Sequence, residues 1–79
     1  MNKTLHPLRK KICGISFPQD RLWQVTTPDF IAGVTEYNDE ITGITSQLRR
    51  AYKTIGTFCW FKQECEKRGW KIEHIEDRR

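Results

Sequence analysis

The sequence predicts a small α+β domain, in which an antiparallel sheet of three or four strands carries two helices packed on one face. Two patterns support this fold class. Apolar and β-branched residues alternate with polar ones between residues 22 and 44, and apolar residues recur at helical spacing between residues 48 and 65. Strands followed by helices favour an antiparallel sheet whose helices lie on one side. The chain has 79 residues, which is enough for one such domain.

Residues 1–20 are predicted to form a basic N-terminal arm or a short surface helix. Four apolar residues recur there at steps of three and four, as in a helical stripe: Leu5, Leu8, Ile12 and Ile15. Gly14 is suited to end such a helix. Three consecutive charged side chains of the arm are expected to be exposed: Arg9, Lys10 and Lys11.

Residues 21–76 are predicted to form the folded domain, which begins with three strands. Alternation places these strands at residues 22–27, 30–37 and 41–44. Short polar turns connect them, so the strands should form an antiparallel meander. Gly33 lies within the second strand, where glycine often marks a bulge or a close neighbour.

Two helices and a last strand are predicted after the meander. The first helix begins near Thr45 and ends at Gly56, and the second spans residues 57–69. A strand over residues 70–75 returns to the sheet, and residues 77–79 are a tail. The core of the whole domain is expected to include Trp23, Val25, Phe30 or Ile31, Val34, Leu48, Tyr52, Ile55, Phe58, Phe61 and Ile72.

Charge is partitioned along the sequence. All fourteen basic residues lie outside residues 22–48, a segment that contains four acidic residues. The predicted strands therefore supply no cationic surface, whereas the arm and the first helix do. A net charge of +4 favours an anionic partner for that surface.

A partner-binding surface is predicted from these two basic segments. In the first helix, Arg49 and Arg50 precede Lys53 by four and three residues, so the three side chains would share an exposed arc. The arm adds Lys10 and Lys11. The alternative interpretation of the helical cations is a solvated helix face without a partner.

Neither a metal site nor a catalytic site is expected. The chain has three cysteines, Cys13, Cys59 and Cys65, which is an odd number. They lack the short paired spacing of a zinc site, and adding His74 as a fourth ligand does not supply it. We expect reduced thiols and no cofactor, as in a cytoplasmic protein without a signal peptide or a membrane span. No phosphate-binding glycine loop or serine nucleophile motif is present, so an enzyme is not expected. Three acidic residues fit solvated turns better than a nuclease site: Asp29, Asp39 and Glu40.

Several short motifs occur together within residues 22–76. They are Trp23-Gln24-Val25-Thr26-Thr27-Pro28-Asp29-Phe30-Ile31-Ala32-Gly33, Ile41-Thr42-Gly43-Ile44, Leu48, Gly56 and Arg68-Gly69-Trp70-Lys71-Ile72-Glu73. This combination resembles small uncharacterised proteins of bacteriophages and other bacterial mobile elements. Such proteins commonly bind a host machine, and they include inhibitors of bacterial defence systems, such as anti-CRISPR proteins.

The sequence therefore supports two hypotheses of function. The resemblance implies a non-enzymatic interaction protein in the bacterial cytoplasm, which binds and inhibits a host protein or a protein–nucleic acid complex. The alternative is a small nucleic-acid-binding module that uses the basic arm and the first helix. Salt distinguishes the two, because direct binding to nucleic acid weakens steeply as the salt concentration rises.

Overall fold

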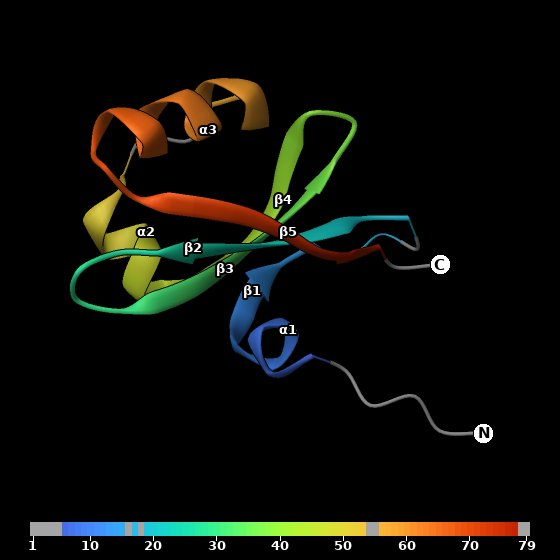
Figure 1. Cartoon of the computed structure of the whole chain (residues 1–79). Coiled ribbons are helices and arrows are strands. Elements are labelled where there is room, and N and C mark those ends of the chain that lie inside the picture. Colours follow the sequence, from blue (N-terminus) through green and yellow to red (C-terminus); the bar gives the residue numbers. More distant parts are fainter. Residues whose placement is uncertain (1–5, 16, 18, 54–55, 78–79) are drawn as a thin grey trace.

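The computed structural model describes residues 6–15, 17, 19–53 and 56–77. Over these residues the chain forms a five-stranded antiparallel sheet and three helices, so the α+β class is confirmed (Figure 1). The elements follow in the order α1 (Pro7–Lys11), β1 (Ile12–Gly14), β2 (Arg21–Thr26), β3 (Ile31–Tyr37), β4 (Glu40–Thr45), α2 (Ser46–Ala51), α3 (Phe58–Lys67) and β5 (Lys71–Asp77). The strand order in the sheet is β1-β4-β3-β2-β5. No helix among these residues is long and apolar enough to cross a membrane.

The predicted meander forms the centre of the sheet. β2 pairs with β3 from Arg21 opposite Glu36 to Thr26 opposite Ile31, and β3 pairs in turn with β4. The β3–β4 turn contains Asn38 and Asp39 at φ angles of 50° and 65°. Two consecutive residues with positive φ are typical of the two-residue turns that match the twist of a hairpin. The last strand, β5, returns to the free edge of β2, as expected.

The predicted sheet of three or four strands is confirmed only in part, because β1 adds a fifth. Residues expected to continue a helix leave it at Ile12 (φ −84°, ψ 130°) and pair with β4. Gly14 makes this pairing possible, since its φ is 146° and a Cβ there would lie 2.2 Å from the Thr42 carbonyl oxygen. Pairing with a distant strand has overridden the local helical spacing. The predicted stripe also included Leu5, which lies outside the described residues.

The helix α1, which is additional to the two helices predicted for the domain, lies on the face of the sheet opposite α2 and α3 (Figure 1). Ala32 and Val34 point into the main core, so Gly33 between them faces the other way. A Cβ on Gly33 would lie 3.0 Å from the Cβ of Leu8, which is buried. The close neighbour predicted from this glycine is therefore the α1 helix.

The N-terminal segment is also held by charge. Arg9 was expected to be exposed, but its guanidinium donates to Asp20 and to Glu76, each at 2.9 Å. These contacts connect α1 to the loop before β2 and to the last strand. Lys10 and Lys11 are exposed, as expected.

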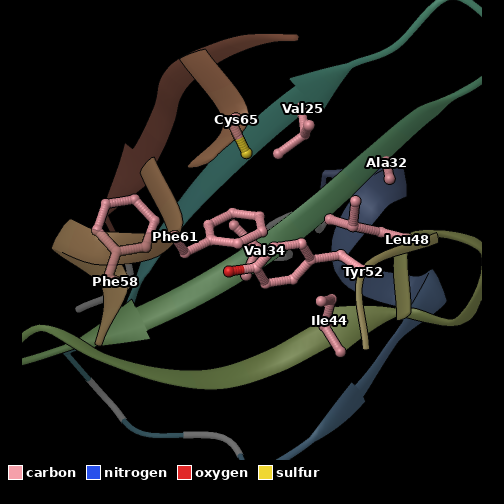
Figure 2. Packing of buried hydrophobic residues seen from close by; sticks show 9 residues of the cluster. All are labelled: Val25, Ala32, Val34, Ile44, Leu48, Tyr52, Phe58, Phe61 and Cys65. Atoms are coloured by element: carbon pink, nitrogen blue, oxygen red, sulfur yellow. The ribbon is translucent and has the colours of Figure 1, made fainter. Parts of the chain in front are cut away.

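The main core lies between the sheet and the helices α2 and α3 (Figure 2). Its buried members are Val25, Ala32, Val34, Ile44, Leu48, Tyr52, Phe58, Phe61 and Cys65. Six predicted core residues are among them, while Trp23, Phe30 and Ile72 are partly buried against the cluster. Ile31 is 55% exposed, so Phe30 is the core residue of that pair. The predicted core residue Ile55 lies outside the described residues.

The helix α2 is shorter than predicted. It ends at Ala51 instead of Gly56, because Tyr52 adopts an extended conformation (φ −130°, ψ 98°). The Tyr52 ring packs edge-on against Phe61, with ring centroids 5.0 Å apart. At the other end of the chain, Asp77 belongs to β5 instead of the predicted tail, and residues 78–79 lie outside the described residues.

Candidate partner-binding surface at the β1 edge

The β1 strand joins the two predicted basic segments. It lies at one edge of the sheet, where β4 is its paired neighbour among the described strands. Lys10 and Lys11 lead directly into β1, and α2 begins directly after β4. Because Ile12 pairs with Thr45, the residue before β1 and the first residue of α2 meet at the same end of this strand pair. The topology therefore brings cations from both segments to one edge.

The start of α2 is fixed by Thr45. Its hydroxyl accepts from the backbone N–H of Gly33 at 2.9 Å and donates to the Gly33 carbonyl at 3.0 Å. This hydroxyl is therefore occupied across the sheet and does not cap the helix. Thr45 is buried, so the contact joins the end of β4, where α2 begins, to β3.

A shallow pocket lies between α2 and β1. Its volume is about 460 Å³, and it is lined by Cys13, Gly14, Ile44, Ser46, Arg49 and Arg50. Ile44 is almost completely buried, whereas Arg49 and Arg50 are exposed in the last turn of the helix. The pocket thus combines an apolar wall with two guanidinium groups beside the sheet edge.

All five predicted partner-binding residues are exposed: Lys10, Lys11, Arg49, Arg50 and Lys53. None of them enters an ion pair among the residues that the structure describes. The predicted helical arc of three cations was wrong in one respect, since α2 ends before Lys53. Lys53 therefore lies beyond the helix and does not share a continuous helical face with Arg49.

A second pocket, of about 700 Å³, lies between α3 and the ends of β2 and β3. Sequence reasoning missed the role of one lining residue, Glu36, which is buried in spite of its charge. One carboxylate oxygen of Glu36 accepts from Trp23 Nε1 at 3.3 Å, and the other accepts from the Asp39 backbone N–H at 3.0 Å. The Lys62 ammonium lies 4.9 Å from the centroid of the Trp23 ring.

The acid at the β3–β4 turn is also structural. Asp39 was expected to be a solvated turn residue, but its carboxylate accepts from the Cys59 backbone N–H at 2.8 Å. This bond, together with the Asp39 carbonyl that accepts from Phe58 N–H, fixes the start of α3 on the hairpin. The sequence indicates a turn here through two turn-forming residues, Asn38 and Asp39. Their partner could not be found without the fold, since it lies twenty residues away.

The cysteines have different surroundings. Cys65 is buried, and burial raises the pKa of its thiol to about 11, whereas Cys13 and Cys59 are exposed. His74, the residue considered as a further zinc ligand, contacts Asp77 at 2.8 Å and the ring of Trp23 instead. Among the described residues no three potential metal ligands lie close enough together to hold an ion.

Comparisons with protein-family models, with curated proteins and with solved structures find no match to this chain. The resemblance to phage proteins therefore stays a prediction that depends on the motifs themselves. Two of their residues, Gly33 and Gly43, lie where a Cβ would be crowded by Leu8 and by Ile12. These motif positions thus have a structural reason that is independent of any partner.

Proposed function

We propose that this chain is a non-enzymatic interaction protein, which binds an anionic partner through the cations around β1. We call this surface the basic edge, and it consists of Lys10, Lys11, Arg49, Arg50 and Lys53. The observation that supports it is the β1–β4 pairing, which brings the basic N-terminal segment and α2 to the same edge of the sheet.

The basic edge is available for binding without internal rearrangement. Its side chains are exposed and form no ion pair with other described residues, so no ion pair among these residues has to break when a partner arrives. Arginine can bind a carboxylate or a phosphate with two parallel hydrogen bonds. Complementary charge also steers the encounter and disfavours basic competitors.

A non-enzymatic role agrees with the use of the reactive side chains. In the larger pocket Glu36 holds the indole of Trp23 and the β3–β4 turn, and Asp39 holds the start of α3. A general acid or base must be able to reach a substrate atom. These two carboxylates are instead engaged in contacts that maintain the fold.

The resemblance indicates the kind of partner. Small phage proteins that bind host machines suggest that the partner of the basic edge is a host protein or a protein–nucleic acid complex, and that binding inhibits it. The acidic element of that partner is either a face of the protein or the phosphates that it carries. An inhibitor of a bacterial defence complex, such as an anti-CRISPR protein, could bind either the acidic protein face or the phosphates of such a partner.

The alternative, a nucleic-acid-binding module, is less well supported by the aromatic residues. Such modules present exposed rings on which bases stack. Trp23 is partly buried against Phe58 and lies under Lys62, and Arg68 lies over both Tyr52 and Trp70. These three rings are therefore occupied by the protein's own side chains, which leaves Trp60, 39% exposed, as the tryptophan that is open for stacking.

The test is a pull-down from lysate of candidate host bacteria, with and without nuclease. The baits are the unchanged chain, the variant Arg49→Glu/Arg50→Glu and the control Lys67→Glu/Lys71→Glu. Both double variants lower the net charge from +4 to zero. A partner kept by the unchanged chain and the control, but lost by the Arg49/Arg50 variant, supports the proposal. Retention by all three baits contradicts it, and capture of nucleic acid without a specific host protein, abolished by nuclease, indicates the nucleic-acid alternative.

A further inference from the structure

We infer that the partner binds the basic edge as an extended acidic segment of a protein, which adds as a strand to β1. This inference rests on the proposed function and specifies how the basic edge is used. It depends on three features of the edge: the free backbone of β1, the pocket beside it, and the placement of cations on both sides of the strand.

Among the described residues, no strand pairs with the outer side of the β1 backbone. Its strand pairing is with β4, and no other described backbone hydrogen bond involves residues 12–15. An edge strand with unpaired N–H and C=O groups is a template for a further strand. Cys13, in the middle of β1, is exposed, and Ile15, which follows the strand, is 69% exposed.

The opposite edge of the sheet, β5, has features that protect an edge strand against the addition of another strand. Lys71 and Glu73 pair on it at 3.6 Å, and further charges follow at Glu76 and Asp77. Its pairing with β2 also shifts register between Leu22 and Trp23. Charged side chains and irregular pairing are typical of edges that resist strand addition. β1, with Ile12, Cys13 and Gly14, lacks charged side chains of this kind.

Side chains of an added strand would point alternately to the two faces of the sheet. On the face shared with α2 they would meet the pocket wall at Ile44 and the guanidinium groups of Arg49 and Arg50. The α1 helix lies on the other face, and Lys10 and Lys11 are at its C-terminal end. A segment with acidic side chains and an aliphatic residue matches this arrangement.

Charge decides between the possible occupants. A second copy of this chain would bring two basic edges together, and like charges at an interface cost affinity. A nucleic acid satisfies the cations but has no peptide backbone to pair with β1. An acidic polypeptide supplies both the carboxylates and the backbone groups, so it is the occupant that uses every feature of the edge.

The experiment compares three probes by titration calorimetry at one ionic strength. The first is a short blocked peptide in which Glu alternates with Val, and the second is the same peptide methylated at its central backbone nitrogens. The third is a single-stranded oligonucleotide with the same net charge. We expect the methylated peptide to bind at least roughly tenfold more weakly than the parent, because it loses hydrogen bonds without losing charge. Amide exchange at residues 12–15 should slow when the parent peptide binds.

The outcomes separate this inference from the proposed function. Equal binding of both peptides, lost in Arg49→Glu/Arg50→Glu, overturns strand addition but leaves the basic edge intact. Tighter binding of the oligonucleotide than of the parent peptide also overturns it, as does a dimer of the free chain in sedimentation. If the Arg49→Glu/Arg50→Glu variant binds both peptides as well as the unchanged chain, the proposed function fails as well.

Discussion

The guanidinium of Arg9 lies 2.9 Å from the carboxylate of Asp20, and the two side chains are only 6% and 2% exposed. Glu76, on the last strand, contacts the same guanidinium at 2.9 Å. One arginine thus connects the N-terminal segment, the loop before β2 and the C-terminal strand. Because α1 and β1 are held in this way, Lys10 and Lys11 occupy a defined position beside the sheet and do not belong to a detached arm.

Replacing Arg9 should destabilise the fold strongly. Arg9→Met leaves the Asp20 carboxylate buried without its partner, and loss of one member of a buried ion pair costs about 3–5 kcal/mol. The free energy of unfolding in urea measures this loss. The control is Lys10→Met at the exposed neighbour, which should change stability by about 0.5 kcal/mol or less. Equal stabilities of the two variants would show that the ion pair is not needed.

Gly14 should be required for the basic edge as well as for stability. Gly14→Ala introduces a Cβ that would lie 2.2 Å from the Thr42 carbonyl oxygen, at a φ of 146°. We expect a cost of at least about 2 kcal/mol and weaker binding of acidic ligands, because β1 would separate from β4. The control is Gly69→Ala, which also has a positive φ but has no atom within 4 Å of the new Cβ. It should cost about 1 kcal/mol and leave binding unchanged; a smaller cost at Gly14 would contradict the tight β1–β4 contact.

Glu36 should stabilise the hairpin as a carboxylate. Its two oxygens accept from Trp23 Nε1 and from the Asp39 N–H, and a glutamine amide can serve only one of these donors. Glu36→Gln should therefore cost about 1–3 kcal/mol and alter the fluorescence of Trp23. Glu40→Gln, at an exposed site, is the comparison and should be nearly neutral. Unchanged stability and fluorescence in both variants would show that the buried carboxylate has no structural role.

Alkaline pH should destabilise the chain partly through Cys65. Burial raises the pKa of this thiol from its ordinary value of 9.0 to about 11. Between these values the unfolded thiol ionises while the folded one stays neutral, so stability falls as the pH rises from about 9 to about 11. Burial raises the pKa of Tyr52 as well, and because Cys65 is the smallest of the causes of that shift, most of the Tyr52 contribution persists in Cys65→Ala. Urea unfolding across this range should show a shallower decline for Cys65→Ala, and identical slopes would refute the role of the thiol.

Much of the sheet and of the core could be predicted because the signals are local. Alternation identified the strands β2 to β4, and helical spacing identified α3 with Phe58 and Phe61. The β1 strand could not be predicted, since Leu8 and Ile12 are spaced as in a helix while the partner of Ile12 is Thr45. Contacts between residues far apart in the sequence leave no local pattern.

In the candidate site, too, local features could be predicted and contacts between distant residues could not. Charge along the sequence identified the residue types of the basic edge, and the structure shows how β1–β4 pairing brings the two segments together. The ion pairs of Arg9 were missed because Glu76 is 67 residues away. The end of α2 before Lys53 was also missed, since the break at Tyr52 depends on packing against Phe61.

The most direct test of the basic edge is a nuclear magnetic resonance titration of the isotopically labelled chain with a short poly-glutamate peptide at low salt. We predict that the largest shift changes of backbone amides occur at residues 10–14 and 46–53, and that they diminish as salt is added. Lys67 and Lys71, whose ammonium groups pair with Glu64 and Glu73, provide the internal control and should change little. Largest changes around Trp23, Asp39 and Lys62, or changes spread evenly over all exposed cations, would contradict the assignment of the partner to the basic edge.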